Sequence, residues 1–205
     1  MEEITKNLSH LMNYRKQVAT EGFVELINKI LAQLPGLGWQ LGSDLADSEL
    51  DRLSLSVAHV PQLLNDAAFV ACFPIHGDGW VIDLGVPPRE WEIYFKATLD
   101  GKVYEVEGQE WFWKMAQEKN MVRLLFAAPP EKFACLDKEV LKEFGEVIAT
   151  GELGELNVMR FFASVGAMLT EGPGEDWLPM ETLRTRFVER FPSCEYAAWL
   201  SAPRE

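Results

Sequence analysis

The sequence is short of the residues and motifs that mark common catalytic chemistry. Its three cysteines, Cys72, Cys135 and Cys194, lie far apart and form no CxxC pair, so the sequence supports neither a zinc knuckle nor a disulfide framework. No HExxH, GxSxG, GxxxxGKS/T or EF-hand pattern occurs, and no GxGxxG follows a strand-like segment. These absences lower the expectation of an enzyme without excluding an unfamiliar catalytic site.

Long apolar runs and basic charge are also scarce. No stretch approaches the length of a membrane span, and residues 1–16 contain no apolar core of the signal-peptide type. The 19 basic residues are outnumbered by 32 acidic ones, which gives a net charge of −13. Because such a surface repels phosphate backbones and anionic lipid, we expect neither nucleic acid nor membrane as a partner. A basic protein, a cationic peptide or a metal ion suits this field better, although acidity that only keeps a cytoplasmic protein in solution is the simpler explanation.

What the sequence does contain is enough apolar material for a core. Hydrophobic residues make up 48% of the chain and charged residues 25%, as in ordinary globular proteins. A chain of 205 residues with this composition forms one large domain or two small ones. We predict an α+β fold, in which an antiparallel sheet built from two β-hairpins is flanked by an N-terminal helical region and a C-terminal helical bundle.

The N-terminal part of the chain combines a clear helix signal with an ambiguous segment. Helical periodicity runs through residues 2–34 and ends at the PGLG stretch that follows. Residues 47–60 fit two patterns, because their apolar residues share one helical face but 53–57 also alternate like a strand. We favour a helix here, ending before Pro61.

The strongest hairpin signal is the Asp-Gly pair at 100–101, between the strand-like segments 91–99 and 102–107. A two-residue turn at this pair places Lys96 opposite Glu105, a favourable cross-strand charge pair. The other face of the same register is apolar and collects Phe95, Ala97, Tyr104 and Val106. Turn chemistry, charge pairing and the apolar face therefore agree on one register.

Residues 108–120, which contain the run Trp-Phe-Trp, predict a further helix, and a strand follows them. Paired prolines make 127–132 the best linker in the chain. We therefore expect an α+β domain over 1–128 and a helical domain or subdomain over 129–205.

The C-terminal part predicts three helices and a short terminal piece. Asp137 is suited to cap a helix that ends near residue 151. The apolar stripe over 158–169 predicts a second helix, and residues 179–191 predict a third. A short helical piece around 196–200 ends the pattern.

The first candidate site is the face of the first predicted hairpin, which carries Cys72, His76 and Asp83. With a turn at 78–79, Asp83 lies diagonal to both other residues and within reach of their side chains. This set could activate a thiolate, and His76 with Asp83 and one of the two other histidines could hold a metal. We favour the simpler interpretation, a hairpin tip whose polar residues are solvated.

The second candidate joins an acidic group to an aromatic one and consists of Glu105, Glu107, Glu110, Trp111 and Trp113. Repulsion between Glu105 and Glu107 on one strand face could raise a carboxyl pKa, as an acid–base pair requires. A solvated acidic face, partly neutralised by a neighbouring lysine, is the simpler hypothesis. Adjacent helical positions point in different directions, so Trp111, Trp113 and the residue between them cannot all enter one core face. A partner-binding patch and a helix sandwiched between other elements both stay open.

The third candidate is a basic group formed by Arg184, Arg186 and Arg190 in the last predicted helix. Such a group can indicate a helix that binds nucleic acid. Residues 129–205 nevertheless contain 14 acidic and 8 basic residues, a net charge of −6. A solvated face is therefore favoured over a nucleic-acid interface.

These observations favour a non-enzymatic cytoplasmic module for protein–protein interaction, of the adaptor, inhibitor or chaperone-like kind. Its expected partner is another protein with basic character, and we expect no cofactor and no metal. The alternative is an enzyme of the hydrolase or thiol type centred on Cys72, His76 and Asp83. A nucleic-acid-binding regulator acting through the C-terminal helices is the third hypothesis. The sequence leaves the oligomeric state open, with a homo-oligomer as one alternative.

Overall fold

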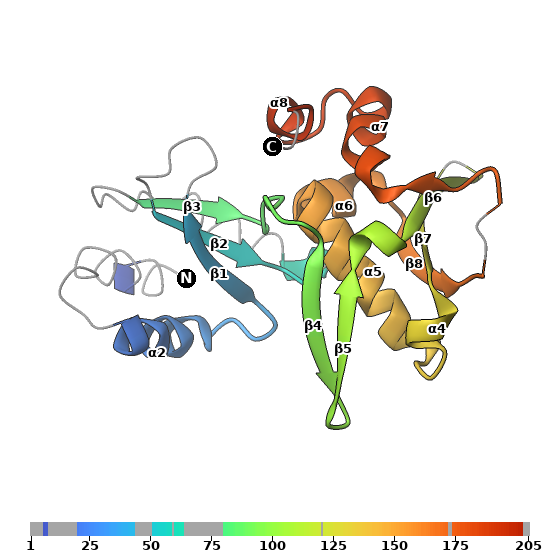
Figure 1. The fold of residues 1–205 in the computed structure, drawn as a ribbon. Coiled ribbons are helices and arrows are strands. Elements are labelled where there is room, and N and C mark those ends of the chain that lie inside the picture. The colour runs from blue at the N-terminus through green and yellow to red at the C-terminus, as the bar shows by residue number, and fades with distance from the viewer. Residues whose placement is uncertain are drawn as a thin grey trace. The chain divides into compact units, whose positions relative to one another are not determined.

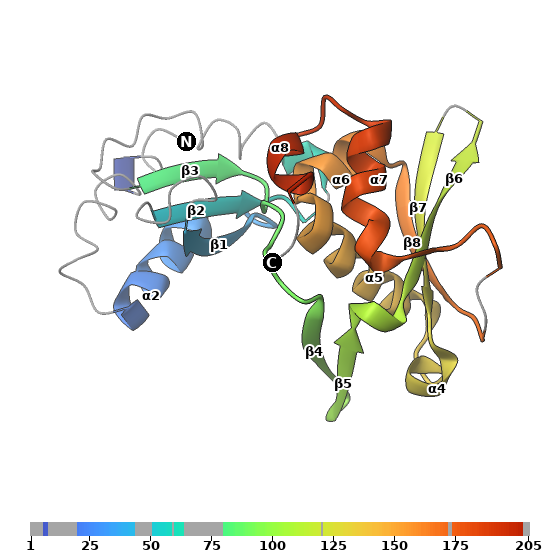
Figure 2. The ribbon, with the colours of Figure 1, turned by 45° about the horizontal axis from the view of Figure 1, so that its top comes forward.

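The computed structural model describes residues 6–7, 20–43, 51–58, 60–63, 80–119, 121–171 and 174–202. Helices and strands mix along the chain, which confirms the predicted α+β class (Figures 1 and 2). The chain divides into two compact units, Met1–Val86 and Pro87–Glu205. Across the described segments, no helix has the length and apolar character needed to cross a membrane.

The division between the units does not fall where the prolines predicted it. The expected linker at 127–132 lies inside the second unit, where strand β7 (Met121–Ala128) is followed by helix α4 (Pro130–Phe133). Phe126 and Phe133, on either side of the paired prolines, are both buried in one hydrophobic core. The prolines therefore end a strand and start a helix, and they do not separate two domains.

In the described part of the first unit, helix α2 accompanies a three-stranded sheet in the order β1-β2-β3. Its elements are α2 (Thr20–Leu31), β1 (Gly38–Ser43), β2 (Asp51–Ser56), a 3-10 turn (Pro61–Leu63) and β3 (Trp80–Leu84). The central strand β2 pairs antiparallel with β1 and parallel with β3. Helix α2 lies within the long helical pattern, and the PGLG stretch at 35–38 leads directly into β1, which begins at Gly38.

The helix favoured for residues 47–60 is wrong, because residues 51–56 form the strand β2. Leu53, Leu55 and Val57, the apolar residues of the alternating pattern that competed with the helical one, are completely buried. Pairing on both sides by β1 and β3 satisfies the backbone of β2 as a strand. Tertiary pairing thus decided between two patterns that the local sequence supported almost equally.

The first predicted hairpin lies mostly outside the described residues. Its turn at 78–79 and its strand at 67–75 are among the residues that the structure does not describe. The second strand is present as β3, and its described neighbour is β2, with Asp51 opposite Trp80 and Leu55 opposite Leu84.

Among its described residues, the second unit combines a hairpin, a four-stranded sheet and five α-helices, one of which is α4. The hairpin consists of β4 (Tyr94–Leu99) and β5 (Lys102–Glu107). The sheet has the order β8-β7-β6-β9, where β6/β7 and β6/β9 are antiparallel and β7/β8 is parallel. Its other elements are β6 (Phe112–Glu118), β8 (Ser164–Leu169), β9 (Leu178–Pro179), α5 (Lys138–Leu153), α6 (Glu155–Phe161), α7 (Leu183–Arg190) and α8 (Ala197–Leu200).

The hairpin at 100–101 is confirmed in the predicted register. Phe95 pairs with Val106, and Lys96 pairs with Glu105. Asp100 and Gly101 have φ angles of 50° and 77°, as a two-residue turn of the primed type requires. The Lys96 Nζ–Glu105 Oε1 distance is 2.7 Å. The Phe95 ring packs edge-on against Phe144 of α5, with 5.7 Å between centroids, so the apolar face of the hairpin meets the helix.

The helix predicted over 108–120 is wrong. A 3-10 turn at Gly108–Glu110 leads into strand β6, which pairs with β7 along its whole length. Trp111 and Trp113 are two residues apart and both point into the core, because side chains alternate along an extended chain. A short apolar run cannot distinguish the two periods by itself, and the partner strand decided the outcome.

The second C-terminal helix predicted over 158–169 is only half right. Helix α6 covers its first part, and residues 164–169 form strand β8, which extends the sheet beside β7. The first C-terminal helix is confirmed as α5, which packs against β8 in the β7–α5–β8 crossover (Figure 2). Its cap is also confirmed, since Asp137 Oδ1 accepts a hydrogen bond of 2.8 Å from the Val140 backbone nitrogen.

Candidate functional site

A pocket of about 680 Å³ lies within the second unit. Its lining comes from the segment after Pro87-Pro88, from the start of α7 and from the C-terminal helix α8. The lining has three main parts: exposed carboxylates, half-buried tryptophan rings and the buried residues that form the floor. The carboxylates are those of Glu90, Glu92 and Glu181, and the tryptophans are Trp91 and Trp199. The floor consists of Ile93, Met180 and Arg184, and Gln109 and Ala202 complete the wall.

One wall is held in place by a close contact with helix α5. Arg89 donates its backbone N–H to the Gly151 carbonyl at 2.7 Å, which ties the extended segment to the last turn of the helix. The Trp91 indole lies directly against Gly151, where a Cβ atom would come within 2.2 Å of the ring. Only glycine leaves room for the indole at this position. The Trp91 ring also stacks on Phe95, with 6.3 Å between centroids.

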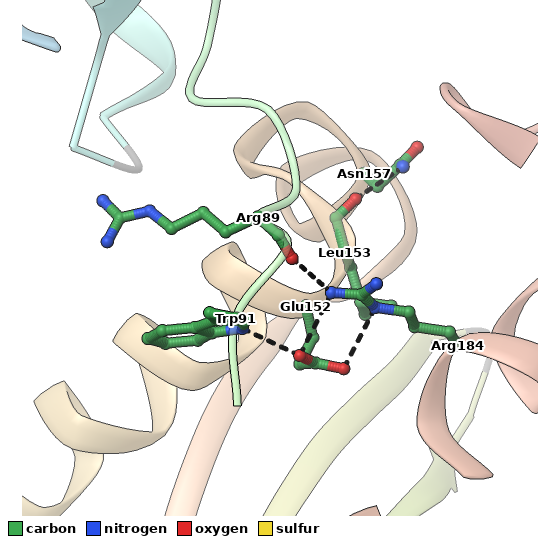
Figure 3. A network of polar contacts seen from close by, with 6 residues as sticks. All are labelled: Arg89, Trp91, Glu152, Leu153, Asn157 and Arg184. Atoms are coloured by element: carbon green, nitrogen blue, oxygen red, sulfur yellow. Dashed lines mark hydrogen bonds and ion pairs between the residues drawn. The ribbon is translucent and has the colours of Figure 1, made fainter. Parts of the chain in front are cut away.

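A buried carboxylate connects the two sides of the pocket (Figure 3). Glu152 of α5 is 0% exposed and accepts a hydrogen bond of 2.9 Å from the Trp91 indole nitrogen. Arg184 of α7 donates to both oxygens of the same carboxylate, at 3.2 Å through Nε and 3.3 Å through Nη2. Arg184 Nη2 also donates to the Arg89 carbonyl at 2.5 Å. The charge of Arg184 is thus neutralised by a two-point contact and by a main-chain acceptor.

The second aromatic wall depends on the same arginine. The Arg184 guanidinium lies over the Trp199 ring, 4.4 Å from its centroid. The segment before α8 is fixed separately by Asn157, which donates to the Glu195 carbonyl at 2.8 Å and accepts from the Glu195 nitrogen at 2.9 Å. A helix of only four residues is thereby held at the pocket, because its stability comes from these contacts rather than from its length.

The floor of the pocket includes a residue in an unusual backbone conformation. Ile93 has a φ angle of 51°, a left-handed conformation that is costly for a β-branched residue. Its carbonyl accepts a hydrogen bond of 2.7 Å from the Gly108 nitrogen. A Cβ at Gly108 would lie 2.2 Å from Ile93 Cγ2, so a glycine is required for this close approach.

The rim of the pocket carries more negative than positive charge. Within the described part of the chain, no ion pair joins Glu90, Glu92 or Glu181 to a basic side chain. Arg184 is already neutralised by Glu152, and the Arg89 guanidinium lies over the Trp91 ring at 5.7 Å from its centroid. Three carboxylates therefore outnumber the one neighbouring cation at the pocket mouth.

The acidic group predicted from the sequence differs from this rim. Glu105 binds Lys96, and Lys132 lies 3.6 Å from Glu107 and 2.6 Å from Glu110. The hydrogen bond and charge of Lys96 lower the pKa of Glu105, opposite to the increase expected from repulsion between carboxylates. Two lysines thus neutralise most of this group.

The two predicted binding tryptophans lie in the core of the second unit. Trp111 is 0% exposed and contacts the rings of Phe126 and Phe133. Trp113 is 2% exposed, and its indole nitrogen donates to the Pro179 carbonyl at 3.0 Å and to Thr182 Oγ1 at 3.1 Å. Their side chains therefore support the sheet and do not form a surface patch.

The Cys72, His76 and Asp83 set is only partly described. Asp83 lies on β3 and forms an ion pair with Arg52 of the neighbouring strand β2. Cys72 and His76 lie outside the described residues, as do the two other histidines. Over the segments that are described, no group of three or more His, Cys, Asp or Glu side chains is placed to hold a metal ion.

The three predicted arginines do not form one basic surface. Arg184 is buried at the pocket, whereas Arg186 pairs with Glu189 at 3.0 Å. Arg190 Nη2 donates to Gln117 Oε1 of strand β6 at 3.1 Å.

The sequence patterns did not identify the residues that matter most at the pocket, although one signal for them was present. Glu152 lies four residues after the buried Ile148, so it places a charge in line with the apolar face of the predicted helix, at that helix's expected end.

Comparisons with known proteins add no relationship to this geometry. The family models, the curated proteins and the solved structures that were searched contain no match to the chain.

Proposed function

We propose that this chain is a non-enzymatic cytoplasmic module for protein–protein interaction, and that its pocket holds a basic side chain of the partner. The observation that carries the proposal is the acidic rim, in which three carboxylates outnumber one cation, around an aromatic and apolar pocket. Glu90, Glu92 and Glu181 supply the charge, while Trp91 and Trp199 supply the walls. A volume of about 680 Å³ lies in the range of ligand pockets and has room for one long side chain together with neighbouring residues of the partner.

The chemistry of a lysine or arginine side chain matches both parts of this pocket. Its aliphatic stem packs on tryptophan rings, and its charged end stays near the carboxylates at the rim. The net charge of −13 also attracts a basic partner from a distance and speeds the encounter. The buried Glu152–Arg184 pair contributes by holding both walls before the partner arrives, which lowers the entropic cost of binding.

Calorimetric titration of the full chain with short capped peptides tests the proposal. The peptides differ at one central position, which is arginine, lysine, leucine or glutamate. We expect saturable binding of the arginine and lysine peptides, and none of the leucine or glutamate peptides. Absence of saturable binding for every cationic peptide contradicts the proposal.

A matched pair of variants locates the binding. Glu92→Gln with Glu181→Gln removes two rim charges, and Glu139→Gln with Glu143→Gln removes two exposed charges from α5. The rim variant should weaken binding by about threefold to tenfold, as expected for two partly exposed ion pairs. The α5 variant should leave the affinity unchanged. Equal losses would mean that only the overall charge attracts the peptide.

A further inference from the structure

A second group of reactive side chains lies away from the pocket and consists of Cys135, Lys102 and Tyr104. Cys135 is exposed in the turn between α4 and α5. Lys102 and Tyr104 are two residues apart on β5, so their side chains leave the strand on the same side. The Cys135 Sγ atom lies 3.3 Å from the Tyr104 hydroxyl and 3.5 Å from Lys102 Nζ.

Both neighbours of the sulfur favour its thiolate form. The Lys102 ammonium is a hydrogen-bond donor only, and it is held over the Tyr104 ring at 4.7 Å from the centroid. The pKa of Tyr104 is raised, chiefly by Cys135, so the phenol keeps its proton and can donate it to the sulfur. The hydrogen bonds from Tyr104 and Lys102, with the charge of Lys102, lower the pKa of the Cys135 thiol. Among the described residues, these are the titratable groups in contact with Sγ.

The chain contains a second described cysteine in the opposite environment. Cys194 is 7% exposed, and burial raises the pKa of its thiol. Cys135 therefore combines access to solvent with two donors, whereas Cys194 has neither advantage. The cluster does not depend on the proposed binding function, because none of its three residues lines the acidic pocket.

We propose that Cys135 is a site of reversible thiol modification by exchange with small anionic disulfides. The Cys135 thiolate attacks one sulfur of the disulfide, a new Sγ–S bond forms, and the original S–S bond breaks. The other half leaves as a thiolate, so the disulfide is both co-reactant and oxidant. The Lys102 ammonium beside Sγ provides a counter-charge for an anionic adduct.

Peptide-resolved mass spectrometry of the intact chain with oxidised glutathione tests this proposal. The rate of adduct formation is followed separately at each cysteine, and the pH dependence is followed with iodoacetamide. At pH 7, the Cys135 peptide should react at least about tenfold faster than the Cys194 peptide, because both access and thiolate fraction favour it. A Cys135 rate no higher than that of Cys194 overturns the proposal.

Two variants separate the cluster from simple exposure. Lys102→Gln and Tyr104→Phe should each move the pH midpoint of Cys135 alkylation upward and slow its reaction at pH 7. Lys119→Gln removes an exposed lysine elsewhere and should leave the midpoint unchanged. Lys102 is exposed, so its variant retains the fold even if the buried Tyr104 position tolerates change poorly. An unmoved midpoint in Lys102→Gln would show that the cluster does not activate the thiol.

Discussion

Two of the ion pairs in the second unit have similar chemistry and very different surroundings. Glu152 and Arg184 form a pair whose side chains are 0% and 9% exposed, whereas the side chains of Lys96 and Glu105 are 55% and 49% exposed. The exposed pair has the shorter N–O distance, 2.7 Å against 3.2 Å. Distance is therefore a poor guide to what each pair does for the protein.

The surroundings of the two pairs explain why they contribute differently to the protein. Water screens the exposed pair and solvates each partner when the pair breaks, so the exposed pair contributes little to stability. The buried pair has lost that water, and each partner depends on the other and on Trp91, Trp199 and the Arg89 carbonyl. The buried pair also shapes a pocket, while the exposed pair selects a hairpin register that the turn already favours.

The largest effect should come from breaking the buried pair. Glu152→Ala leaves the Arg184 guanidinium and the Trp91 indole without their carboxylate acceptor. We expect the free energy of unfolding to fall by about 3–5 kcal/mol, measured by urea denaturation. Glu143→Ala on the exposed side of the same helix should change it by less than about 0.5 kcal/mol.

A double substitution sharpens this point. Glu152→Met with Arg184→Met removes both charges, so no unpaired ion remains in the interior. The double variant should therefore be more stable than Glu152→Ala alone. If the single and double variants are equally destabilised, packing and not the unpaired charge explains the loss.

The next effect concerns the contact that holds the first pocket wall. Gly151→Ala places a Cβ at 2.2 Å from the Trp91 ring, so the indole must move away from Glu152. We expect a loss of about 1–3 kcal/mol, as for overpacking elsewhere, together with a change in tryptophan fluorescence. Gly42→Ala is the matched control, because a Cβ there meets no atom within 4 Å. Unchanged fluorescence in Gly151→Ala would contradict the role given to this glycine.

The smallest effect should come from the exposed pair, where we expect a change in pKa and only a small change in stability. Lys96 lowers the pKa of Glu105, so Lys96→Gln should raise that pKa toward 4.5, measured by NMR titration of the carboxyl group. A carboxylate with a lowered pKa stabilises the folded state above its unfolded pKa, and this contribution disappears as pH falls through the folded pKa. At pH 7 the free energy of unfolding of Lys96→Gln should therefore fall only slightly, by less than about 0.5 kcal/mol, because water screens this exposed pair.

Sequence reasoning succeeded where local chemistry was decisive. The turn at 100–101 requires two left-handed residues, and its flanking residues agree with one register. The Asp137 cap likewise depends on neighbours three residues away. Sequence reasoning failed at 108–120 and at 164–169. Short apolar runs there fit both helical and strand periods, and pairing with a distant strand decided between them.

The candidate pocket could not be assembled from the sequence for a related reason. Trp91, Glu152 and Arg184 are separated by 61 and 32 positions, and no local pattern states that they meet. The acidic group at 105–110 was visible in the sequence, but its neutralising lysine at 132 comes from a different element.

The sequence by itself determined the acidic charge, the α+β class, the hairpin at 100–101 and the capped helix α5. Each of these follows from composition or from residues that are neighbours along the chain. Only the tertiary structure decided which carboxylates are neutralised, which tryptophans form the core and which line a pocket. The physical reason is that burial and charge pairing depend on contacts between distant segments, and the energies of those contacts exceed local preferences.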